Sequence, residues 1–241
     1  MKILDDLISD VKKDITVREV YACVFWTAVI TKNCGLASTL HEGHPSHKIV
    51  GDPGMLRGKS ALELIEYARS DSLLEASIGM AAINSLIDID EDRCVEKNAF
   101  DILAAKGENK NIAIVGHFPW VPKLKKIARE FFVIEQNPQE GDFPEDASEE
   151  ILPKADVVGL TGTAFINHTI EKLLNLCKDK FIVMVGPTSP LSPVLFDYGI
   201  DVIGGSMVVD SEKTIRSITE GATFRQVKGA KNLNMFSKKY F

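Results

Sequence analysis

The sequence predicts an α/β protein with a parallel sheet that helices cover on both faces. In the second half of the chain, short apolar runs recur, separated by segments long enough for helices. The runs are continuously apolar instead of alternating, as strands buried on both faces are. Each run ends in glycine, hydroxyl or ionisable residues, as strands do around a ligand crevice. The runs are Ile112–Val115, Phe131–Ile134, Asp156–Leu160, Phe181–Val185 and Val202–Ile203.

The composition is typical of a globular protein. The chain has 241 residues, 45% of them hydrophobic, and a mean hydropathy of +0.01. Its formal net charge is −6 and it has no block of lysine and arginine, so we expect no nucleic-acid partner. Its apolar stretches are shorter than the roughly 20 residues of a membrane span, and its acidic start is unlike a signal peptide. The four cysteines form no CxxC pair, which is typical of reduced thiols. We therefore expect a cytoplasmic protein with no membrane partner.

The first part of the chain predicts a small α+β region. Apolar residues at spacings of three and four predict an amphipathic helix over residues 2–13. Residues 16–31 are rich in β-branched and aromatic side chains and are too long for one average strand. We expect a hairpin or a bent strand there, and a further strand over 36–40. Ser60 is positioned to cap a helix over residues 61–68.

A helix over residues 73–87 is predicted to be buried on several sides, because its sequence is small and apolar nearly all round. We place it at the interface of two domains; the alternative is that it faces a second subunit in a homodimer. Its polar residue Asn84 is expected to make a structural hydrogen bond rather than a ligand contact. Residues 88–110 are charged and aperiodic, which predicts a boundary between domains of residues 1–108 and 109–241.

A loop with three histidines contains the first candidate metal ligands. His41, His44 and His47 are separated by two residues each, and imidazole nitrogens suit a divalent transition metal. The loop also contains glycines and prolines, so the spacing fixes no ligand geometry. A solvated loop whose histidines have no specific role is the alternative interpretation.

Polar residues at the strand ends predict a single ligand site. In a parallel sheet the ligand lies beyond the carboxyl ends of the strands, where the strand order reverses. The segment Thr161–Thr163 precedes a predicted helix, whose free N–H groups and dipole favour an anion; ordinary helix capping by Thr163 or Ser189 is the alternative. We expect a small anionic molecule as the partner. The candidate binding residues are Gly116, Phe118, Pro119, Glu135, Asn137, Thr161, Gly162, Thr163, Asn167, Thr169, Gly186, Thr188 and Ser189.

The first two apolar runs belong to a strand-turn-helix-strand unit of the nucleotide-binding type. Glu135 ends the second run, where a dinucleotide-binding fold holds a ribose hydroxyl. The turn at Gly116 lacks the second and third glycines that let a pyrophosphate approach. A nucleotide-like ligand without a pyrophosphate, such as an adenosyl group, therefore fits better than NAD.

Two histidines are the candidate reactive groups of this half. His117 directly follows a strand end, so it is a candidate general acid–base or metal ligand, and a surface-loop role is the alternative. His168 lies opposite the apolar face of its predicted helix, so we expect it to point to solvent or toward the crevice. Residues 135–150 contain seven acids and no lysine or arginine, which predicts a solvated flap that disfavours polyanions.

Several motifs together resemble a known family. Val115-Gly-His-Phe-Pro119, Leu160-Thr-Gly-Thr163, Gly186-Pro-Thr-Ser-Pro190 and the apolar segment 76–85 are similar to those of a little-characterised bacterial and archaeal family described as "Putative heavy-metal chelation" proteins. The resemblance covers nearly the whole chain. It implies a small α+β domain like the N-terminal domain of enolase, followed by a Rossmann-like domain with a parallel sheet and helices on both faces, and a site between the two.

Three functions are open from the sequence. The first is binding of a small anionic or metal-chelating molecule, or of a divalent metal, in an interdomain cleft. The second is an enzyme that uses an adenosyl or other nucleotide-like cofactor. The third is a binding or regulatory module without turnover. The sequence has no Ser-His-Asp spacing, P-loop lysine motif or HExxH motif, so it indicates none of the commonest catalytic chemistries.

Overall fold

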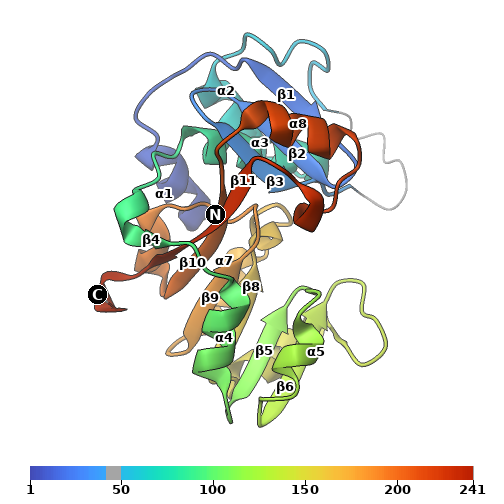
Figure 1. Ribbon diagram of the computed structural model, residues 1–241, viewed down its shortest axis with the longest axis vertical. Coiled ribbons are helices and arrows are strands. Elements are labelled where there is room, and N and C mark those ends of the chain that lie inside the picture. Colours follow the sequence, from blue (N-terminus) through green and yellow to red (C-terminus); the bar gives the residue numbers. More distant parts are fainter. Residues whose placement is uncertain (42–49, 241) are drawn as a thin grey trace.

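The computed structural model describes residues 1–41 and 50–240. The described chain forms a three-stranded sheet and an eight-stranded sheet, with helices packed around both (Figure 1). Within these residues no helix is both long enough and apolar enough to cross a membrane. The cytoplasmic location stays a prediction.

The first part of the chain folds as the small α+β region that its sequence predicts. The amphipathic segment forms α1 (Lys2–Asp10). The β-rich segment after it is a hairpin of β1 (Glu19–Ala22) and β2 (Trp26–Ile30). The turn after β2 leads into β3 (Cys34–Ser38), which pairs antiparallel with β2 and completes the small sheet.

Two short helical segments and one long helix follow. Ser60 caps α2 (Ala61–Ile65), as predicted, by accepting the backbone N–H of Leu62 at 3.1 Å. The chain continues as a 3₁₀ turn, η1 (Glu66–Arg69), and then as α3 (Leu73–Leu86).

The helix α3 is buried on all sides, as its apolar composition predicts. A Cβ atom at Gly79 would lie 2.0 Å from the backbone nitrogen of Ala68, so this helix and η1 touch through their backbones. On the side of the small sheet, a Cβ atom at Gly35 would lie 2.1 Å from the Ala81 carbonyl oxygen. Within the described chain, α3 is thus enclosed by η1, β2 and β3, and a homodimer stays a prediction.

The large sheet confirms the predicted α/β fold class. Its strand order is β4-β11-β10-β9-β8-β5-β6-β7. In this order, the neighbouring strands β10, β9, β8, β5, β6 and β7 are parallel. The strand β11 is antiparallel to β10, and β4 is antiparallel to β11. The five predicted runs form β5, β6, β8, β9 and β10, and the order reverses between β5 and β8. The strands are β4 (Cys94–Val95), β5 (Asn111–Val115), β6 (Glu130–Glu135), β7 (Phe143–Pro144), β8 (Val157–Thr161), β9 (Phe181–Val185), β10 (Val202–Val208) and β11 (Ala230–Phe236).

Helices cover both faces of the large sheet. One apolar cluster joins α4 and α5 to the face that carries Ile112 and Ile114, and another joins α1 and α7 to the opposite face. The helix α8 lies instead beside the small sheet (Figure 1), where Ile218 packs in a cluster with Leu36. These helices are α4 (Ala99–Gly107), α5 (Val121–Leu124), α6 (Ser148–Ile151), α7 (Ile170–Leu176) and α8 (Ser211–Thr219). The 3₁₀ turns are η2 (Glu91–Arg93), η3 (Glu145–Ala147), η4 (Leu152–Lys154), η5 (Gly162–Phe165), η6 (Pro193–Tyr198), η7 (Phe224–Gln226) and η8 (Lys238–Tyr240).

The prediction that residues 88–110 are an aperiodic boundary is wrong in part, because this segment contains both β4 and α4. Ala99, Ile102 and Leu103 form the buried face of α4, at spacings of three and one residues. Both elements lie with the large sheet, ahead of the predicted boundary after residue 108. One apolar core also joins the small sheet to the large one. The division into two domains stays a prediction.

Candidate functional site

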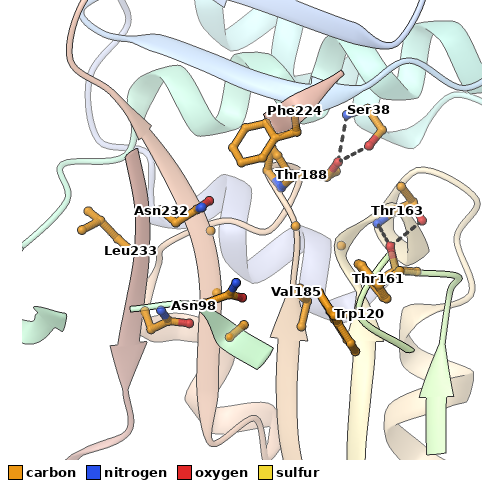
Figure 2. Close-up of a pocket in the computed structure, with 18 of the residues that line it drawn as sticks. Ser38, Asn98, Trp120, Thr161, Thr163, Val185, Thr188, Phe224, Asn232 and Leu233 are labelled. Carbon is orange, nitrogen blue, oxygen red and sulfur yellow. Dashed lines mark hydrogen bonds between the residues drawn. The ribbon is translucent and has the colours of Figure 1, made fainter. Parts of the chain in front are cut away.

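A cavity of about 320 Å³ lies beyond the carboxyl ends of β8 and β9, under the edge of the small sheet (Figure 2). We call it the main cavity. Its lining comes from β2 and β3 of the small sheet, from the loops after β5, β8 and β9, from β10 and β11, and from the N-terminus of α4 and η7. Its size lies at the lower end of the range for small-molecule sites. The cavity is therefore formed by segments from both parts of the chain.

Hydroxyl groups join the small sheet to the loops of the large sheet at the edge of the main cavity. The Thr188 hydroxyl accepts the Ser38 backbone N–H at 2.9 Å and lies 3.1 Å from the Ser38 hydroxyl (Figure 2). Close by, Asn84 donates from Nδ2 to the carbonyl oxygens of Leu36 at 2.8 Å and Thr188 at 3.2 Å. Asn84 thus has the structural role that its sequence context predicts, and it holds this side of the cavity in a fixed position.

Two aromatic pairs form apolar walls of the main cavity. The rings of Phe118 and Trp120 are stacked, with centroids 4.7 Å apart and an interplanar angle of 6°. From the small sheet, Trp26 packs on Phe224 of η7 at 5.4 Å, and its indole N–H donates to the Ala222 carbonyl oxygen at 3.0 Å. Both tryptophans of the chain therefore line this cavity. Flat aromatic walls of this kind favour a ligand with a planar ring.

The charge of the main cavity is positive although the chain as a whole is acidic. Among its lining residues that the structure describes, Lys97 and Arg225 are the charged ones, and the lining includes no Asp, Glu, His or Cys. Both side chains are exposed, and neither forms an ion pair within the described part of the chain. Two unpaired cations in the lining attract an anion and repel a bare metal cation.

The structure distributes the predicted binding residues over two neighbouring spaces. A small pocket of about 60 Å³ lies beside the main cavity and shares the lining residues Thr161 and Thr163 with it. Ser189 is buried in contact with Gly162, and Asn137 is exposed outside both spaces. The main cavity receives Phe118, Pro119, Thr161, Gly162, Thr163, Gly186 and Thr188, and the small pocket receives Gly116, Glu135, Asn167 and Thr169.

The prediction that Glu135 holds a ribose does not agree with its surroundings. One carboxylate oxygen of Glu135 accepts the backbone N–H of His117 at 2.8 Å, and the other accepts that of Gln136 at 3.0 Å. The small pocket beside it has room for a few water molecules but not for a nucleoside. An adenosyl group would therefore have to occupy the main cavity.

The predicted helix dipole behind Thr161–Thr163 is also absent from the described chain. This segment starts η5, a 3₁₀ turn of four residues, and the chain then passes through His168 in a left-handed conformation (φ 60°) before α7 begins. The Thr163 N–H already donates to the Thr161 hydroxyl at 3.3 Å. Capping is thus observed, but the cap is Thr161 and not Thr163 or Ser189, which the alternative interpretation named.

The two candidate histidines lie apart and outside both spaces. His117 pairs through Nδ1 with the carboxylate of Asp142 at 3.0 Å. His168 places Nε2 2.9 Å from the Ala68 carbonyl oxygen, so this nitrogen carries the proton and is not a metal ligand. The prediction that His168 points to solvent or to the crevice is therefore wrong, because its side chain hydrogen-bonds to η1. Of the histidine loop, His41 is exposed, and His44 and His47 lie outside the described residues.

The cysteines are separate, and their thiols are held in the neutral form. Burial raises the pKa of Cys34 and of Cys177 to about 12 and that of Cys94 to about 11. Cys34 lies in β3, whereas Cys177 follows α7 on the large sheet. Thiolates are the form that binds metals, so these thiols are poor ligands near neutral pH.

The raised thiol pKa values predict a loss of stability at alkaline pH. Above pH 9.0, the ordinary thiol value, the unfolded chain releases protons that the folded chain keeps until about pH 12. The free energy of unfolding is therefore expected to fall as the pH rises through this range. Urea denaturation at pH 8 and pH 10.5 measures the fall, and a Cys34→Ala/Cys177→Ala variant should show a smaller one. An equal fall in both proteins would contradict this assignment.

Comparison with known proteins finds relatives without an assigned reaction. Two family models described as "Putative heavy-metal chelation" match residues 98–236 and residues 4–87. An uncharacterised protein of Methanocaldococcus jannaschii is 30% identical over 217 residues, which are 87% of this chain and 81% of the relative. A crystal structure of a protein of unknown function from the DUF364 family of Desulfitobacterium hafniense has a TM-score of 0.84 and 26% identity, over 98% of each chain. Another from Pyrococcus horikoshii, with a TM-score of 0.83 and 22% identity over 98% of this chain and 100% of that one, shows the fold alone.

Proposed function

We propose a function for this chain, which belongs to the family described as "Putative heavy-metal chelation". Its main cavity binds a small organic anion with a planar ring. The observation that carries the proposal is the lining: two aromatic pairs, two unpaired cations and a set of hydroxyl and amide groups. The aromatic walls accept the ring, and Lys97 and Arg225 attract the negative charge.

The family description implies a heavy metal, but the described side chains form no site that would hold a metal ion. Heavy metals prefer thiolate and imidazole ligands. Within the described residues, no group of three or more His, Cys, Asp or Glu side chains is arranged to hold an ion. The buried thiols are neutral and lie in different elements. We therefore propose that the organic anion supplies the ligands of the metal, as a chelator, and that side chains of this chain do not.

The lining supports binding more than acid–base catalysis. The described lining residues offer hydroxyls, carboxamides, one amine and one guanidinium, but no imidazole, thiol or carboxylate to move a proton near neutral pH. A nucleotide-like ligand remains a candidate of the same class, because a base is a planar ring and a phosphate is an anion. Its ring would lie on the aromatic walls of the main cavity and not beside Glu135.

A thermal-shift panel tests the proposal. It compares aromatic carboxylates and nucleoside monophosphates with Zn²⁺ and Cd²⁺ alone, on protein treated with a chelator. A ligand at about 100 times its Kd should add roughly 2.7 kcal/mol to the free energy of unfolding, a rise of about 5–10 °C in Tm. We expect at least one organic anion to reach this shift and the metal ions not to. Stabilisation by the metals alone would overturn the proposal.

A further inference from the structure

One buried carboxamide in the lining of the main cavity has a partner for its nitrogen but, within the described chain, none for its oxygen. Asn234 lies in the middle of β11, opposite Gly204 of β10, and its residue is 1% exposed. Asparagine is disfavoured inside a buried strand, where its polar groups need partners. Its Oδ1 atom has no hydrogen-bond partner within the described chain. Leaving a buried acceptor unpaired costs roughly 1–3 kcal/mol, so a donor is expected in the working protein.

The orientation of this carboxamide is fixed by its other end. Asn234 donates from Nδ2 to the Lys97 carbonyl oxygen at 2.6 Å, just before the helix α4. Turning the amide over would place Oδ1 against that carbonyl, and two acceptors would then face each other. The unpaired atom is therefore the oxygen, and it needs an N–H or O–H group.

A side chain at position 204 would crowd the unpaired oxygen. A Cβ atom at Gly204 would lie 3.0 Å from Asn234 Oδ1 and 3.2 Å from the Ala99 side chain. Gly204, Asn234 and Ala99 all line the main cavity. The added Cβ atom would also lie 3.0 Å from the Met184 carbonyl oxygen, so glycine is the residue that keeps this side of the Asn234 oxygen free of a side chain.

We infer that Asn234 reads a hydrogen-bond donor on the ligand, and that the ligand is an amino- or hydroxy-substituted aromatic or heteroaromatic acid. This inference rests on the proposed function of the main cavity. The anionic group accounts for Lys97 and Arg225, the ring for the aromatic walls, and the N–H or O–H substituent for the unpaired oxygen. Asn234 is a specificity-determining residue in this account and takes no part in chemistry.

The test uses three ring acids that differ at one position: 6-hydroxy-2-naphthoate, 6-methoxy-2-naphthoate and 2-naphthoate. Isothermal titration gives the affinity of each for the wild-type protein. A satisfied buried acceptor should favour the hydroxy acid over the other two by about 10-fold. Comparable binding of all three would overturn the inference, since it would mean that a structural water satisfies the oxygen.

Two variants separate recognition from general damage. Asn234→Leu should keep its affinity for 2-naphthoate and lose the preference for the hydroxy acid. Asn137→Leu, an exposed asparagine outside both the main cavity and the small pocket, should keep the preference. A preference that survives in Asn234→Leu would overturn the inference, and if that variant does not fold, the wild-type ratio still decides. If none of the three acids binds wild-type protein, the inference is overturned, whereas the proposed function is decided separately by the thermal-shift panel.

Discussion

Replacing Gly79 with alanine is expected to lower the free energy of unfolding by about 3 kcal/mol or more. The added Cβ atom would lie 2.0 Å from the Ala68 nitrogen and 2.6 Å from its Cα, so the backbones of α3 and η1 would have to move apart. Alanine is the better helix former by only about 1 kcal/mol. The clash therefore outweighs the gain in helix propensity, and the fall in Tm should be about 6–12 °C.

A matched control isolates the packing effect from backbone strain. Gly58 has a φ of 87° and no heavy atom within 4 Å of an added Cβ. Gly58→Ala should cost only about 1 kcal/mol, the strain of a left-handed conformation. Chemical denaturation of both variants measures the difference. Equal losses would contradict the close approach of α3 and η1, and with it the rigid support of β3 at the cavity edge.

The double charge reversal Lys97→Glu/Arg225→Glu is expected to weaken binding of an organic anion by about 100-fold. Two opposite charges 4 Å apart in water attract by about 1 kcal/mol, and reversal replaces attraction by repulsion at both positions. Salt at physiological strength screens part of this effect. Neither side chain is buried or ion-paired in the described chain, so the stability should change little. Titration calorimetry at two salt concentrations measures the loss.

The control for this prediction carries the same change in net charge away from the cavity. Lys12 and Lys13 follow α1, are exposed, and do not line the main cavity. Lys12→Glu/Lys13→Glu should retain most of the affinity. If both double variants lose affinity equally, the effect reflects the overall charge of the protein, and the two cavity cations have no special role.

The architecture of the large sheet could be predicted from the sequence because its central strands are continuously apolar. The antiparallel strand β11 was not predicted, since polar residues such as Asn232 and Asn234 interrupt its apolar pattern. The helix α8 was missed with it, although it has clear amphipathic spacing. These two elements bring η7 and the asparagines of β11 into the main cavity. An asparagine on either side of Leu233 was the signal that could have indicated a polar wall.

The sequence predicted loops that meet at the main cavity but only part of its lining, and that a ligand binds there stays a prediction. The strand-end rule correctly brings the loops after β5, β8 and β9 to one crevice. The rule does not say which side chains already form hydrogen bonds within the protein. Those of Glu135 and His168 form them with backbone groups. Nor does it include residues from other elements, such as Trp26 of the small sheet or Lys97 before α4. These contacts depend on tertiary packing that local spacing does not encode.

Tryptophan fluorescence tests the central claim most directly, because both tryptophans of the chain line the main cavity. The chelator-treated protein is titrated with 2-naphthoic acid derivatives or nucleoside monophosphates in one series, and with Zn²⁺ or Cd²⁺ alone in the other. The variants Trp26→Phe and Trp120→Phe show which tryptophan gives the fluorescence change. The account predicts a saturable change with an organic anion that the Lys97→Glu/Arg225→Glu variant weakens, and no saturable change with metal alone. A saturable response to the metals, with none to any organic anion, would contradict it.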